Sequence, residues 1–294
     1  MKIRRRKFLT GAACSLLSKP ALAWFPHGSS SAAPGLNITW VNGDGTWASA
    51  PAGWTVVRNQ FTTNMAAWFS NPVTLVIDIG YGTMGGSPVG GGSASSASTY
   101  ATPSYASTKA AMLAVPTYAS ATLPSSVSGT FMTTSPLGQA LGLNGPAPGG
   151  IDAYAGFNSG ISWDLHTDGS CAGGLKSLIG DMFHEITETM GRQYYESGYT
   201  TSQSLFSFTS AGVRSVVQSD ARYFSDDNGT TNLGAYRYYS GSGGGDPGDW
   251  VGLSDCCNFS VATGTSGVPT QRDMRIMAAM GWNLTAAGRA MAGI

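Results

Sequence analysis

The residues best suited to chemistry lie together in the pentapeptide His184-Glu185-Ile186-Thr187-Glu188. The chain contains only three histidines and three glutamates, and all three glutamates (Glu185, Glu188 and Glu196) closely follow His184. A solvent-exposed helix normally draws freely on glutamate and lysine, so this concentration of rare residue types indicates a functional site. In a helix, His184 and Glu188 are four residues apart and lie side by side on one face.

This spacing allows two side chains of one helix to bind the same metal ion, as in the HExxH motif, with Glu188 in place of the second histidine. Zinc accepts imidazole nitrogen and carboxylate oxygen at about 2.0–2.2 Å. It also lowers the pKa of a bound water towards about 7. We predict that His184 and Glu188 bind Zn²⁺ and that Glu185 is the general base that deprotonates the attacking water.

A catalytic zinc site usually has three protein ligands, and no histidine follows His184 in the sequence. The third ligand is then a carboxylate or a phenol. We predict Asp249, which follows Gly248 in a glycine-rich segment, because such a loop can approach a metal closely. The other candidates for this position are Asp246, Tyr194, Asp226 and Asp227.

Two residues after the motif could stabilise the oxyanion that forms when a carbonyl is attacked, namely Tyr195 and Arg192. We assign this role to Tyr195. For Arg192 we favour a different role, in which it pairs with an acidic neighbour and holds the turn after the helix.

The segment His184–Arg192 (HEITETMGR) resembles the HEI[ST]E-x-MGR signature of a bacterial family of secreted metalloproteases, divergent members of the zincin/metzincin group. The similarity covers about residues 36–285 and includes Val73–Tyr81, Asp152–Phe157, Tyr223–Ser225, Gly248–Trp250 and Met277–Leu284. It implies one zincin-like α+β domain, with a mixed sheet, an active-site helix and a loop-rich C-terminal part. Gly191 matches the glycine of the metzincin pattern HExxHxxGxxH, but Tyr194 stands where the third histidine belongs.

Hydrophobic periodicity predicts the elements that position these residues. Apolar residues at helical spacing predict a helix over 175–191 that ends at Gly191. Residues 82–107, rich in Gly, Ser, Ala and Thr, are interpreted as a long surface loop, with a flap beside a cleft as the alternative. We further expect strands over 36–41, 73–79 and 149–157 and helices over 54–69, 108–115 and 271–281. A substrate peptide would add as a strand to a sheet edge, which we assign to residues 149–157.

The N-terminus has the features of a bacterial export signal. Residues 1–23 combine Arg5-Arg6-Lys7-Phe8-Leu9 with a short apolar stretch and the small residues Ala21 and Ala23, which predicts a twin-arginine signal peptide. We therefore expect an exported protein, periplasmic or extracellular. We divide the rest into a flexible leader (24–35), the zincin-like domain (36–285) and a C-terminal tail (286–294).

Composition narrows the classes of partner. Basic and acidic residues are equal in number, 16 each, but six of the bases lie in residues 1–23, so the remaining chain is acidic. The excess of acidic over basic residues argues against a nucleic-acid binder. No stretch of the sequence reaches the roughly 18 consecutive apolar residues that a membrane span needs. We expect a monomer that acts on a protein or peptide substrate. Cys171 could pair with Cys256 or Cys257 in an oxidising compartment.

The leading interpretation is an exported zinc-dependent endopeptidase. Two alternatives remain open. The missing third histidine favours a degenerate zincin fold that binds a partner or a surface polymer. The richness in Gly, Ser and Ala, with few charges, favours a structural protein of the cell envelope.

Overall fold

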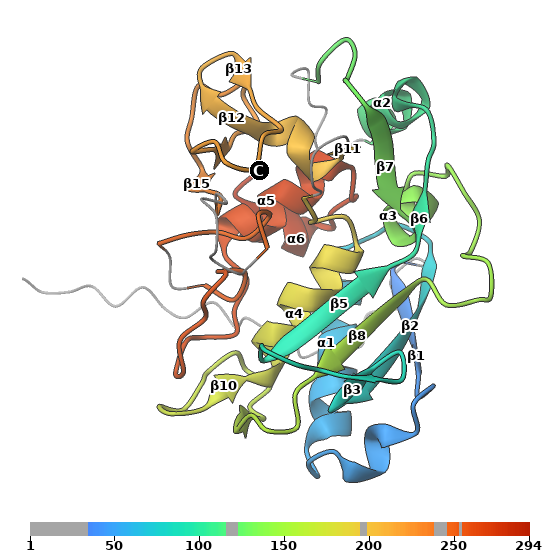
Figure 1. Ribbon diagram of the computed structural model, residues 1–294, viewed down its shortest axis with the longest axis vertical. Coiled ribbons are helices and arrows are strands. Elements are labelled where there is room, and N and C mark those ends of the chain that lie inside the picture. Colours follow the sequence, from blue (N-terminus) through green and yellow to red (C-terminus); the bar gives the residue numbers. More distant parts are fainter. Residues whose placement is uncertain (1–34, 116–122, 195–198, 238–245, 253–254) are drawn as a thin grey trace, which may run out of the picture.

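The structure is a computed structural model that describes residues 35–115, 123–194, 199–237, 246–252 and 255–294. The predicted signal peptide, nearly all of the predicted leader and Tyr195 lie outside these residues. Figure 1 shows a four-stranded sheet with α1 and α4 packed against it, and the C-terminal part of the chain on the other side of α4.

The main sheet has the strand order β1-β2-β8-β5. Three of its strands are parallel, namely β1 (Asn37–Val41), β2 (Thr74–Tyr81) and β8 (Ala153–Phe157), whereas β5 (Ala94–Ser98) is antiparallel to β8. Leu75, Ile77 and Ile79 of β2 are fully buried, as expected for a strand with neighbours on both sides and helices over it. The strands predicted at 36–41 and 73–79 are confirmed.

Two predictions about this sheet are wrong. Residues 82–107 contain β3 (Thr83–Met84), β4 (Ser87–Pro88), β5 and β6 (Tyr100–Ala101) rather than one long loop. The segment 149–157 holds β8, an interior strand, and the edge strands of the sheet are β1 and β5. Gly156 lets β3 approach β8 closely, because a Cβ atom on this residue would lie 2.5 Å from the carbonyl oxygen of Thr83.

Helix α4 (Leu178–Thr189) lies between the sheet and the C-terminal part. It begins later than the predicted residue 175, because Lys176–Ser177 form β10 and the Ser177 hydroxyl caps the helix by accepting from the Gly180 N–H at 3.2 Å. The predicted stop is confirmed, since Gly191 has a positive φ of 115°. Helix α1 (Trp54–Trp68) packs against α4, with the rings of Trp68 and Phe183 6.0 Å apart.

Two helices close the chain. Helix α5 (Gln271–Met280) begins with a capping box in which the Asp273 carboxylate accepts from the N–H of Thr270 at 2.6 Å. The segment predicted as a C-terminal tail forms helix α6 (Ala286–Ala292), which packs against α1 and α5.

The remaining elements are short and belong to smaller sheets and turns. Two more helices are described, α2 (Tyr105–Ala114) and α3 (Ser135–Ala140). The short strands are β7 (Thr130–Thr134), β9 (Trp163–Asp164), β10 (Lys176–Ser177), β11 (Tyr199–Thr201), β12 (Ser207–Ser210), β13 (Val213–Arg214), β14 (Tyr223–Phe224) and β15 (Gly234–Ala235).

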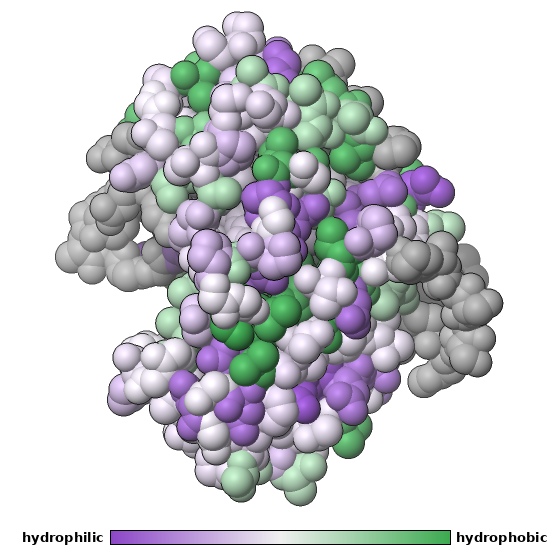
Figure 2. All heavy atoms as spheres, turned by 90° about the vertical axis from the view of Figure 1, so that its right-hand side faces the viewer, coloured by the Kyte–Doolittle hydropathy of each residue, from purple (hydrophilic) through white to green (hydrophobic). Residues whose placement is uncertain are grey.

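The α+β class predicted from the sequence is confirmed. The face in Figure 2 is covered mainly by hydrophilic and weakly polar residues, with hydrophobic residues scattered among them. Among the described residues, no helix combines the length and the apolar character needed to cross a lipid bilayer.

Candidate metal centre

Helix α4 brings His184 and Glu188 together as the four-residue spacing predicts. The Nε2 atom of His184 lies 3.2 Å from Oε1 of Glu188. The helix holds these side chains in place because its opposite face is anchored in the core, where Leu178, Met182 and Ile186 are fully buried. The polar pair therefore lies on the face of α4 turned away from these anchors.

The third predicted ligand, Asp249, comes from a loop distant in sequence. Its Oδ1 atom lies 3.1 Å from Nε2 of His184. The loop is fixed by its neighbour Trp250, which is fully buried and stacks on Tyr236 at 5.0 Å. The indole N–H of Trp250 also donates to Oδ1 of Asp273 at 2.6 Å. These contacts set the position of the Asp249 backbone beside α4.

The three donor atoms of His184, Glu188 and Asp249 all lie within 4.8 Å of one another. Ligand atoms about 2.0–2.2 Å from a tetrahedral ion are about 3.3–3.6 Å apart, slightly longer than the 3.2 and 3.1 Å that separate Nε2 of His184 from the two carboxylate oxygens. One imidazole and two carboxylates also form a donor set that zinc accepts. The side chains are 13%, 9% and 5% exposed, so the group is enclosed yet reaches the surface of a cleft. The residues present therefore fit a zinc ion.

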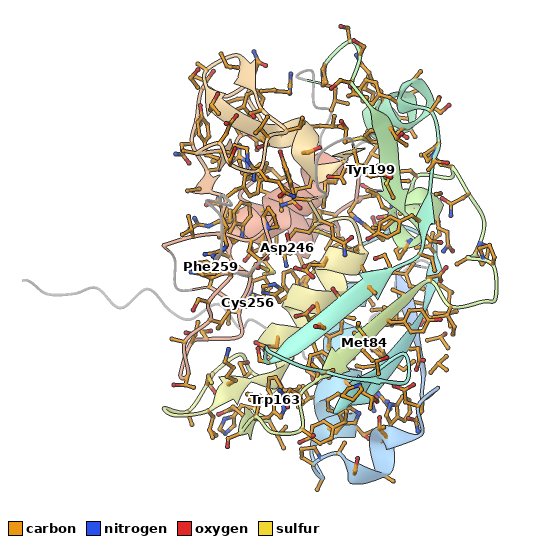
Figure 3. All side chains as sticks on the ribbon, viewed as in Figure 1. Met84, Trp163, Tyr199, Asp246, Cys256 and Phe259 are labelled. Atoms are coloured by element: carbon orange, nitrogen blue, oxygen red, sulfur yellow. The ribbon has the colours of Figure 1, made fainter. Side chains whose placement is uncertain are left out.

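A hydrogen bond on the far side of the imidazole fixes its tautomer. Nδ1 of His184 lies 2.8 Å from the carbonyl oxygen of Cys256. A carbonyl can only accept, so Nδ1 carries a hydrogen, and in the neutral ring Nε2 is left as an acceptor for a metal. Figure 3 shows Cys256 beside α4, with Asp246 and Phe259 nearby.

Ser96 of the edge strand β5 orients the second candidate ligand, Glu188. Its hydroxyl donates to Oε2 of Glu188 at 2.7 Å. This leaves Oε1, the oxygen nearer to His184, free of the Ser96 bond. The contact joins β5 to α4 at the centre of the site.

Arg192 pairs with acidic neighbours, as predicted. Its Nη1 donates to Oδ1 of Asp249 at 2.9 Å, its Nη2 to the carbonyl of His184 at 3.0 Å, and Nη2 lies 3.5 Å from Oε1 of Glu188. The side chain is completely buried behind the ligands. Because it does not reach the surface of the cleft, the structure gives no support to an oxyanion-stabilising role for Arg192.

Burial and the charges of this cluster shift the pKa values of its side chains. Burial alone would lower the pKa of His184, but the charge of Asp249 and the hydrogen bonds of Asp249 and Glu188 raise it well above its ordinary value. Burial raises the pKa of Glu185 well above its ordinary value, and the nearby charge of Glu188 adds to this. Burial would also raise the pKa of Asp249, but His184 and Arg192 hold it below its ordinary value.

The centre opens into a cleft of about 630 Å³. Its walls are the segment 91–96, which includes the first part of β5, and the loop 258–261, with Asp181 and Glu185 of α4 between them. A second cavity of about 310 Å³ lies next to it and is lined by the second half of β5 and by Gln193 and Tyr194. Both cavities include Ser96, Glu188 and Asp246, so Glu188 lies where the two cavities adjoin.

The other candidates are not part of the group of three donors. Asp246 lines the cleft, but its Oδ1 accepts from the N–H of Gly248 at 2.6 Å. The Tyr194 hydroxyl donates to the carbonyl of Ser215 at 3.1 Å. Asp226 forms an ion pair with Arg275, and Asp227 accepts from the hydroxyls of Ser225 and Thr231. Tyr195 lies outside the described residues.

Sequence reasoning missed Ser96, Asp181 and the carbonyl of Cys256. Asp181 could have been found, because it precedes Glu185 by four residues and shares its helix face. Ser96 carries no such signal among its many serine and alanine neighbours.

No protein-family model, curated protein or solved structure matches the chain. The resemblance to the metalloprotease family stays a prediction.

Proposed function

We propose that this chain is an exported zinc-dependent endopeptidase with a zincin-like fold. His184, Glu188 and Asp249 would hold the zinc ion, and Glu185 would be the general base. The observation that carries the proposal is the convergence of three donor atoms, from one helix and one distant loop, within 4.8 Å of one another at the floor of a cleft.

The chain's own residues have clear roles in this chemistry. A bound zinc ion supplies a Lewis acid and an acidified water. Glu185 lines the cleft one residue after His184 and accepts the proton of the attacking water. Burial and the charge of Glu188 raise the pKa of Glu185, and a higher pKa makes its carboxylate a stronger proton acceptor.

The edge strand β5 supports a peptide as substrate. The side of β5 opposite β8 has no strand beside it in the described part of the sheet, so its backbone can pair with an added strand. Cavities extend to both sides of Glu188. A chain bound there would continue past the centre in both directions, which favours cleavage inside a polypeptide over removal of a terminal residue.

Zinc content and proteolysis test the proposal together. The purified chain should contain stoichiometric zinc and cleave casein or a peptide library, and a chelator should abolish cleavage. Glu185→Gln should lower cleavage by about 10²–10⁴-fold while the zinc content stays unchanged, because Glu185 is not a ligand. Cleavage that withstands both the chelator and the substitution would overturn the assignment.

One observation favours a second candidate, a degenerate zincin-like protein that binds a partner without catalysis. The guanidinium of Arg192 already contacts Asp249 and Glu188, so the cluster can be an ion-pair network without metal. Metal analysis separates the two, because the network requires no ion.

A further inference from the structure

Cys256 and Cys257 are adjacent buried thiols beside the candidate metal centre, and the proposed chemistry uses neither. Their sulfur atoms lie 4.0 Å apart, and the two residues are 1% and 0% exposed. Cys171 does not pair with them, contrary to the option considered from the sequence, since all three thiols are free.

The peptide bond between these cysteines connects them to the centre. Its carbonyl accepts the Nδ1–H of His184 at 2.8 Å, and its N–H donates to Oδ1 of Asp255 at 3.0 Å. Carbonyl and N–H belong to one planar unit. A rotation of this peptide therefore removes the partner of the imidazole.

We propose that Cys256 and Cys257 are a site of oxidative modification: a vicinal disulfide forms between them and withdraws the Cys256 carbonyl from His184. Neighbouring Cα atoms are about 3.8 Å apart across a trans peptide, whereas disulfide-bonded residues usually have Cα atoms about 4.4–6.8 Å apart. Closing the eight-membered ring must therefore twist the peptide that holds the imidazole.

The oxidant is a low-molecular-weight disulfide. The thiolate of one cysteine attacks it, forms a mixed disulfide and releases one small thiol. The second cysteine attacks the mixed disulfide, closes the ring and releases the other small thiol, and the two protons of the cysteines pass to the released thiols. Both thiols are buried, and burial raises the pKa of each, so the oxidant reaches a thiolate only when this segment opens locally to solvent.

Loss of the carbonyl should weaken metal binding. Removing an outer hydrogen-bond partner of a metal-binding histidine typically lowers metal affinity about 10–100-fold. This consequence rests on the proposed zinc site, whereas the disulfide and the loss of the His184 hydrogen bond do not.

The chain has only three histidines, so ¹⁵N-histidine labelling gives a direct view of this hydrogen bond. The full chain is treated with oxidised glutathione and then with a reducing agent. We expect peptide mass mapping to show Cys256 linked to Cys257, and the Nδ1–H signal of His184, assigned with His184→Asn, to disappear on oxidation and return on reduction. Zinc affinity, measured against a chromophoric chelator, should fall about 10–100-fold on oxidation.

Cys171→Ser is the matched control and should respond as the unmodified chain does. Cys257→Ser should keep the His184 signal under oxidant; if that variant fails to fold, Cys257→Ala replaces it. The inference is overturned if oxidation yields only mixed disulfides or links to Cys171, or if the vicinal disulfide forms and the His184 signal persists. A reduced chain that binds no zinc would contradict the proposed function, while the His184 signal would still decide this inference.

Discussion

Nε2 of His184, in helix α4, lies 3.1 Å from Oδ1 of Asp249, in a loop fixed by the buried Trp250. Asp249→Asn should therefore weaken zinc binding by more than about 100-fold, since the loss of a ligand should cost more than the loss of an outer partner. The asparagine can still accept from Arg192, so the fold should survive. Calorimetric titration with zinc measures the change.

The control for this substitution is Asp168→Asn, which alters an exposed aspartate outside the cleft. It should leave zinc affinity unchanged. Equal affinities of the Asp249 variant and the unmodified chain would show that Asp249 is not a ligand.

Ser96→Ala should lower zinc affinity about tenfold, because it removes the hydrogen bond of 2.7 Å that orients Glu188. Ser95→Ala is the matched control, since successive residues of a strand point to opposite faces. Chelator competition distinguishes the two variants. A loss of affinity shared by both would indicate a general disturbance of β5.

Zinc affinity should rise with pH. Burial lowers the pKa of His184, but Asp249 outweighs this effect and the pKa is raised well above its ordinary value. Near neutral pH the metal-free imidazole therefore carries a proton that zinc must displace. Titrations in buffers of different ionisation enthalpy should show proton release on binding near neutral pH. The release should shrink as the pH exceeds the pKa of His184. Affinity independent of pH would show that His184 is not protonated in the metal-free protein.

Asp255 should make the protein less stable as the pH rises. Burial, and then the charge of Asp273, raise the pKa of Asp255 from 3.8 to about 7. The folded state thus holds a proton that the unfolded chain has already lost, and the stabilisation present below the unfolded pKa disappears as the pH rises through about 7. Asp255→Asn should consequently stabilise the protein more at about pH 8 than at about pH 4, as measured by urea unfolding. An equal gain in the free energy of unfolding at both pH values would show that the raised pKa of Asp255 does not cause the pH dependence.

Helix α4, which carries two of the candidate ligands, could be predicted because both of its signals are local. Apolar residues at helical spacing define the buried face, and His184 and Glu188 follow the same period on the other face. Asp249 could be proposed only from its glycine-rich surroundings, since its approach to His184 depends on contacts such as the stacking of Trp250 on Tyr236.

Strand β5 could not be predicted because its sequence, Ala94-Ser95-Ser96-Ala97-Ser98, has no hydrophobic alternation. All five residues are half-buried, and their small side chains let α4 approach. The role of Cys256 was equally hidden, because the group that contacts His184 is a backbone carbonyl, which every residue possesses. Such contacts depend on tertiary packing rather than on residue type.

Gly191→Ala should destabilise the protein more than Gly142→Ala, although both glycines have positive φ angles, 115° and 69°. A Cβ atom at Gly191 would lie 2.8 Å from Cδ2 of Leu137, which is fully buried, whereas none of the described atoms lies within 4 Å of one at Gly142. Both variants should lose about 1 kcal/mol or more from backbone strain. Gly191→Ala should lose about 1–3 kcal/mol more from crowding. Urea unfolding at fixed pH measures the difference. Equal losses would show that Leu137 adapts without cost. A larger loss at Gly191 would instead show that the turn carrying Arg192 to the two carboxylates depends on tight packing against Leu137.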